Sequence, residues 1–141
     1  KVTKHKVWFI RVENKQPVWA DKFIDAISQS KIALNLSQGK SSMYYTSDRF
    51  AQLIGNGLLV MINKKTKFND FFNNDEIVTY KDINDLSQKI IKYSNNDALR
   101  QKIAKKGRDK YFKYFNSTIV ADFIIKKTFK IDKLYFWENK N

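Results

Sequence analysis

The chain has 141 residues, of which 43% are hydrophobic and 15% aromatic, and its formal net charge is +13. This length fits one domain with a substantial core, and the apolar content excludes a wholly disordered chain. The chain has no cysteine and one histidine, His5, which excludes disulfides, thiolate metal sites and a His-rich metal cluster. We therefore expect no metal site.

The positive charge comes mainly from lysine, because only four of the 27 basic residues are arginine. The lysines are spread along the chain, whereas a nucleic-acid surface concentrates basic residues and favours arginine. The abundance of Lys, Asn, Ile, Phe and Tyr also fits an AT-rich genome. We therefore favour a solvated surface, and nucleic acid is not the expected partner. A nucleic-acid-binding or membrane-peripheral module without catalysis stays the alternative.

No apolar run approaches the roughly 18 residues of a membrane-spanning helix, and no secretory signal is recognisable. We expect a cytoplasmic chain, with peripheral association at an anionic membrane surface as a variant.

The first half of the chain alternates strands with helices. In order, the patterns predict a strand over 6–12, a helix over 18–30, a strand over 31–37, a helix over 47–56 and a strand over 58–62. The last strand is almost wholly apolar, which is typical of a strand buried on both faces of a parallel sheet.

The second half adds one strand, over 76–80, and then becomes helical. Helices are predicted to begin at Asp82, Asp97 and Asn116. The helix after Asp82 is expected to present Ile83, Leu86, Ile90 and Tyr93 on one side, and the next helix to turn Lys102, Lys105, Lys106 and Lys110 to water. The order of elements predicts an α/β fold, a single Rossmann-like lobe whose parallel sheet is flanked by helices, with a helical C-terminus.

Ligands of open parallel sheets bind at the carboxyl ends of the strands. Asn35 and Ser37 end one strand here, and Ser47, Asp48 and Arg49 open the helix that follows. Arg49 is the main candidate, because a guanidinium at a helix start clamps phosphates; the alternative is a surface salt bridge. Asp48 is either the helix N-cap or a ribose acceptor, and Ser47 either the cap or a phosphate contact.

Four further residues accompany this group. Gln52 is either a ribose contact or an exposed polar residue, and Gly57 is suited to the left-handed conformation after a helix. Tyr44 and Tyr45 either stack on a base or sugar or simply pack. Together the pattern predicts a site for a phosphate-bearing, sugar-bearing ligand.

The segments 31–37, 47–60 and 75–82, with the helix through Leu86, resemble in their order the C-terminal lobe of GT-B glycosyltransferases, most closely the spore-maturation-protein-like group. The resemblance covers roughly residues 7–127. It implies a transferase of the hexosyl type that binds a UDP- or GDP-linked sugar as substrate, with no resident cofactor. The same order is also similar to the donor lobe of α1,3-fucosyltransferases, which implies GDP.

The resemblance also implies roles for individual parts of the chain. Residues 1–128 form the nucleotide-sugar-binding lobe, and the apolar tail 129–141 docks on an N-terminal acceptor lobe absent from this chain, without which no sugar is transferred to a glycan, lipid or protein acceptor. Gln52 stands where related lobes carry a ribose-binding Glu. Backbone groups of Arg11 and Val12 are expected to meet the base, and Arg49 is the expected catalytic residue.

Overall fold

The structure, a computed structural model, describes residues 20–36 and 41–138. These residues contain a parallel sheet of three strands in the order β1 (Ile32–Asn35), β2 (Leu59–Asn63) and β3 (Val78–Tyr80). The helices around it are α1 (Ala20–Ser28), α2 (Arg49–Gly55), α3 (Ile83–Ser94), α4 (Asp97–Tyr114) and α5 (Ser117–Thr128), with short 3₁₀ turns η1 (Lys64–Thr66) and η2 (Phe68–Asp70). The predicted strand over 6–12 lies outside the described residues.

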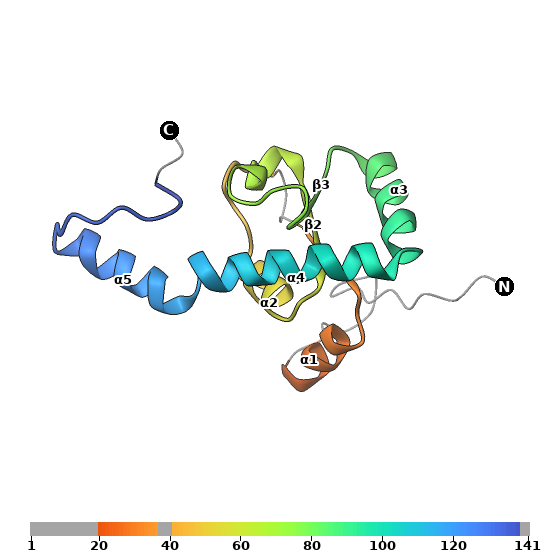
Figure 1. The fold of residues 1–141 in the computed structure, drawn as a ribbon, viewed down its shortest axis with the longest axis horizontal. Helices are drawn as coiled ribbons and strands as arrows, with labels where there is room; N and C mark the ends of the chain where they lie inside the picture. The colour runs from red at the N-terminus through yellow and green to blue at the C-terminus, as the bar shows by residue number, and fades with distance from the viewer. Residues whose placement is uncertain (1–19, 37–40, 139–141) are drawn as a thin grey trace.

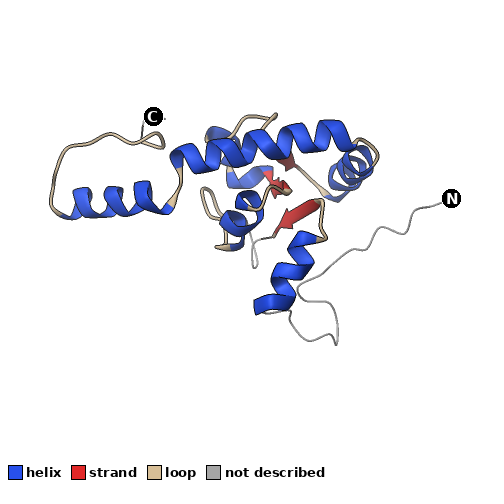
Figure 2. Ribbon diagram, turned by 60° about the horizontal axis from the view of Figure 1, so that its bottom comes forward, coloured by secondary structure: helices blue, strands red, loops and turns tan. Residues whose placement is uncertain are grey.

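The long helix α4 organises this arrangement. It passes over the sheet, where it contacts α2, α3 and β2, and α5 extends beyond it (Figure 1). Figure 2 shows the three strands between α4 and α1. The architecture confirms the predicted α/β fold with a parallel sheet flanked by helices, consistent with a single Rossmann-like lobe.

Strand β2 is buried on both faces, as its apolar sequence predicts. Leu59 and Met61 pack in a cluster with residues of α3 and α4, whereas Val60 and Ile62 pack with α2 and the aromatic side chains after η1. The four side chains are at most 1% exposed. Because successive side chains point to opposite faces of the sheet, this one strand contributes to both halves of the core.

The start of α3 follows a local capping rule, whereas the burial of its apolar side chains does not follow from their spacing alone. Asp82 caps α3 as predicted, with its Oδ1 accepting from the Asp85 N–H at 2.9 Å. Of the four apolar residues on the predicted side of α3, Ile83 and Ile90 are 71% and 39% exposed. Leu86 and Tyr93 alone provide the buried stripe of α3. This helix packs at the edge of the sheet, against β3 and α4, so its inward stripe is narrow.

Two charged residues also differ from their predicted surroundings. Strand β3 begins at Val78, so Glu76 does not start the strand but lies in a turn, where its Oε2 accepts from the Asn73 N–H at 2.7 Å. The same oxygen accepts from Lys110 Nζ at 2.6 Å. Lys110, predicted to face water, is only 13% exposed. The turn approaches α4 closely enough to cover this lysine, which the helical periodicity of α4 alone does not reveal.

The C-terminal segment folds back on its own chain. The Phe136 ring stacks on Tyr114 at 4.3 Å between centroids, and Trp137 stacks on Phe115 at 5.5 Å. In contrast, Phe129 and Leu134 are 72% and 74% exposed. None of the helices in the described ranges has both the length and the apolar character that crossing a membrane requires.

Candidate functional site

A buried asparagine ends strand β1 and anchors the segment that leads into α2. The Asn35 side chain is 4% exposed, and its Nδ2 donates to Thr46 Oγ1. Its Oδ1 accepts from the Ser47 hydroxyl at 3.0 Å. Both polar groups of the amide are therefore satisfied, as a buried amide requires. The result is a fixed connection between the carboxyl end of β1 and the start of α2.

Arg49 extends this connection outward. Its Nε donates to Ser47 Oγ at 3.3 Å, so one hydroxyl joins the guanidinium to the buried amide of Asn35. Within the described part of the chain, the Arg49 side chain forms no ion pair and no other hydrogen bond. Its two terminal nitrogens have no partner among the described residues and can donate to an anion, while the inner nitrogen holds the guanidinium in place. We refer to Asn35, Thr46, Ser47 and Arg49 as the Arg49 cluster.

Asp48 performs the capping role that the sequence left open between two residues. Its Oδ1 accepts from the Arg49 N–H at 2.9 Å, whereas the Ser47 hydroxyl points to Asn35 instead. Asp48 is exposed. A carboxylate therefore lies beside the guanidinium at the start of α2 without forming an ion pair with it.

The remaining predicted residues are not part of this cluster. Gln52 and Tyr45 are exposed, and no hydrogen bond of their side chains is present among the described residues. Gly57 adopts the predicted left-handed conformation, with φ of 77°, but it follows α2 and precedes β2. It thus lies near the amino end of β2, across the sheet from the carboxyl end that carries Asn35. Ser37, Arg11 and Val12 lie outside the described residues.

Tyr44 connects the Arg49 cluster to the loop that follows β2. Its N–H donates to the Thr66 carbonyl at 2.8 Å, and its hydroxyl donates to Asp70 Oδ2 at 2.9 Å. The hydrogen bond to Asp70 raises the pKa of Tyr44. The Tyr44 ring also packs on Phe71 at 5.3 Å between centroids. These contacts tie the loop before α2 to the loop after β2 at one edge of the sheet.

Sequence reasoning missed Thr46, which accepts the second hydrogen bond of Asn35. The signal was present, because Thr46 directly precedes the Ser47-Asp48-Arg49 start of the helix. Sequence reasoning also missed the lysines that follow β2 and β3. These lysines lie near one another only because the two strands pair. Within the described ranges, no group of three or more His, Asp or Glu residues is arranged to hold a metal ion.

The comparison with protein families decides the class of this chain. Residues 3–126 match a family model described as glycosyl transferase-like. The chain belongs to this family. A search of curated proteins finds no match.

Membership in the glycosyl transferase-like family indicates a transferase, and with it a donor and an acceptor substrate in general terms. The matched range includes β1, α2, β2 and β3, and hence the entire Arg49 cluster. The polar groups at the carboxyl edge of the sheet thus lie inside the segment that carries the family likeness.

Proposed function

We propose that this chain is the donor-binding half of a GT-B glycosyltransferase and that the Arg49 cluster binds the diphosphate of a nucleotide sugar. One observation carries the proposal. A guanidinium whose two terminal nitrogens have no partner among the described residues is fixed, through Ser47, to a buried amide at the carboxyl end of a parallel strand. In a glycosyl transferase-like chain, this is the edge at which a nucleotide is expected.

The chemistry of transfer explains why an arginine is needed. When the bond between sugar and nucleotide breaks, negative charge grows on the departing diphosphate. Arg49 would stabilise that charge through paired N–H donors aimed at phosphate oxygens. Ser47 and Asn35 are positioning residues in this scheme, because they hold the guanidinium in place before the donor arrives. Asp48 and Gln52 are the proposed contacts to ribose hydroxyls.

The acceptor half of the reaction lies outside the proposed role of this chain. We expect this chain to bind a nucleoside diphosphate but to transfer no sugar alone, since a GT-B enzyme closes its site between two lobes. The exposed Phe129 and Leu134 side chains fit docking of the C-terminal tail on such a lobe. A preference for GDP over UDP would favour the fucosyltransferase-like variant over the spore-maturation-protein-like group.

Calorimetric titration of the chain with UDP and with GDP tests the proposal. We expect one of them to bind, and Arg49→Ala to weaken that binding by about tenfold or more, because hydrogen bonds to charged groups contribute roughly 1.5–3 kcal/mol. Lys102→Ala is the control, since it removes one positive charge from an exposed position on α4. The proposal fails if the folded chain gives no heat with either nucleotide, or if the Arg49 variant binds as tightly as the control.

A further inference from the structure

An open hollow lies at the carboxyl ends of β2 and β3, beside the Arg49 cluster. Its volume is about 490 Å³. The residues that line it are Lys64, Lys65, Lys67, Asn69, Asp70 and Lys81. Three of the lysines follow β2, and Lys81 directly follows β3. Parallel pairing of Asn63 with Tyr80 brings these two chain segments to the same edge of the sheet. We call this feature the lysine hollow.

The charge of Lys81 contributes, after that of Lys89, to the lowered pKa of Asp85, but the four ammonium groups of the lysine hollow have no ion-paired carboxylate among the described residues. None of them forms an ion pair with a residue in the described ranges. One carboxylate, Asp70, lines the hollow, and it already accepts the Tyr44 hydroxyl. Lysines elsewhere are of both kinds: Lys106 and Lys110 pair with Asp75 and Glu76, whereas others, such as Lys102, form no ion pair with a described residue.

Four like charges around one hollow repel one another, and an anion seated among them relieves that repulsion. Lysine ammoniums are compact donors suited to phosphate oxygens. The hollow has a volume of about 490 Å³, far more than the roughly 30 Å³ that a water molecule occupies in the liquid, so it has room for a phosphate group.

We propose that the lysine hollow is a second anion site, which holds a phosphate-bearing ligand other than the donor diphosphate. The inference rests on the proposed function, because it assigns the donor diphosphate to the Arg49 cluster. The cluster follows β1, whereas Lys81 follows β3, and β2 runs between them. Two strand spacings separate the outer strands by roughly 10 Å. The second ligand therefore lies next to the donor along one edge of the sheet.

Inorganic pyrophosphate is the probe, and backbone amide signals in NMR spectra of the ¹⁵N-labelled full chain are the readout. We expect signals of Lys64, Lys65 and Lys81 to move during titration, and the affinity to fall as salt is added. The double substitution Lys64→Gln with Lys65→Gln is expected to weaken binding by about tenfold or more, since it removes half of the positive charge around the hollow.

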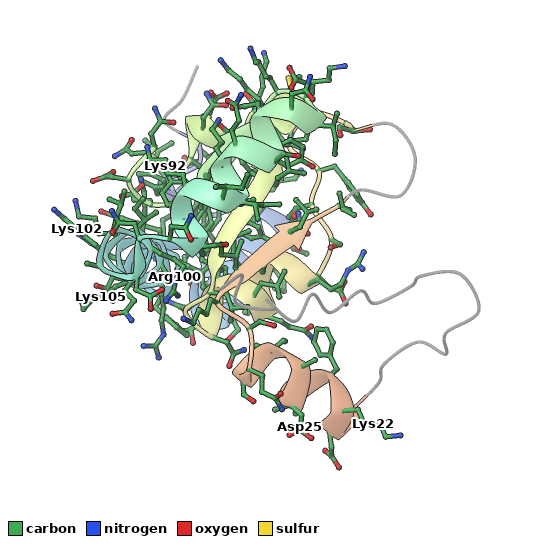
Figure 3. All side chains as sticks on the ribbon, turned by 90° about the vertical axis from the view of Figure 1, so that its right-hand side faces the viewer. Lys22, Asp25, Lys92, Arg100, Lys102 and Lys105 are labelled. Carbon is green, nitrogen blue, oxygen red and sulfur yellow. The ribbon has the colours of Figure 1, made fainter. Side chains whose placement is uncertain are left out.

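The matched control is Lys22→Gln with Lys102→Gln, which removes the same charge. Figure 3 shows these two side chains on different helices, α1 and α4. Both side chains are exposed, and neither forms an ion pair with a described residue. The control is expected to bind pyrophosphate as the unmodified chain does. Equal weakening in both double variants overturns the proposal, because the attraction then reflects net charge rather than a site.

Arg49→Ala separates this proposal from the donor proposal. The variant is expected to retain pyrophosphate at the lysine hollow, and the Lys64/Lys65 variant is expected to retain UDP or GDP. If saturating nucleotide displaces pyrophosphate from the hollow, the hollow belongs to the donor site and the second-site proposal is wrong. If no nucleotide binds while pyrophosphate still moves the Lys64 and Lys81 signals, the donor proposal fails and the anion site stands.

Discussion

Gly107 lies within α4, where an alanine would ordinarily be the better residue by roughly 0.5–1 kcal/mol. A Cβ built at this position meets the Glu76 carbonyl oxygen at 2.1 Å and its carbon at 3.2 Å. Ordinary contacts between heavy atoms are about 3.5–4.0 Å, so the backbone of the turn must move by more than about 1 Å. The glycine thus permits α4 to lie directly against the turn before β3.

We expect Gly107→Ala to destabilise the chain, although helix propensity favours alanine. Overpacking that shifts backbone costs about 1–3 kcal/mol, and the gain in propensity returns up to about 1 kcal/mol. Because the added Cβ meets backbone atoms, the upper part of the overpacking range applies, about 2–3 kcal/mol. The net loss is therefore about 1–2 kcal/mol. Urea unfolding followed by far-UV circular dichroism measures it as a lower midpoint at an unchanged slope.

Gly55→Ala is the matched control, because the added Cβ there meets Phe112 Cζ at 3.8 Å, an ordinary contact. We expect this variant to be neutral or more stable by up to about 1 kcal/mol, since Gly55 is the last residue of α2. A Gly107→Ala chain whose urea midpoint equals or exceeds that of the unmodified chain would refute the close approach of α4 to the turn.

Two further predictions concern a helix cap and the C-terminal segment. Asp82→Ala removes the cap of α3 and should cost about 1 kcal/mol in urea unfolding, and an unchanged midpoint would contradict that role. Burial and the Asp122 hydrogen bond raise the pKa of Tyr135 to about 12, so the stability this phenol provides is intact below about pH 10 and lost as the pH rises towards 12. The Lys133 ammonium and the Tyr135 hydroxyl lower the pKa of Asp122 to about 2, so its contribution holds above about pH 4 and is lost as the pH falls through 2. The indole NMR signal of Trp137, which stacks on Tyr135, should change in both windows; a signal constant from pH 2 to 12 would exclude this linkage.

The sequence predicted those features that depend on neighbours in the chain. The apolar run of β2, the Asp82 cap and the left-handed Gly57 each follow from residues within one turn or one strand. Part of the Arg49 cluster was predictable for the same reason. Ser47 and Arg49 open α2, and Asn35 ends the strand immediately before that loop.

Features that depend on distant segments were not predictable from the pattern. Lys110 has the periodicity of an exposed helical residue, but the turn that contains Glu76, 34 positions away, and the rings of Phe72 and Phe136 lie against it. Ile83 and Ile90 have the periodicity of a buried face, but no element covers that side of α3 in the described structure. The lysine hollow needs the register between β2 and β3, which no local pattern specifies.

The positions of the acidic residues decide which positive side chains have a partner, and the net charge of +13 does not show this. Codon composition bears on the number of lysines, but it does not decide which of them acquire a partner. On α4, Lys105, Lys106 and Lys110 are each paired with a carboxylate. At the carboxyl edge of the sheet, the terminal nitrogens of Arg49 and the lysines of the hollow have none among the described residues. Arg49 and these four lysines thus lie together at the edge where an α/β fold binds its ligands, and we expect a phosphate-bearing substrate to supply negative charge there.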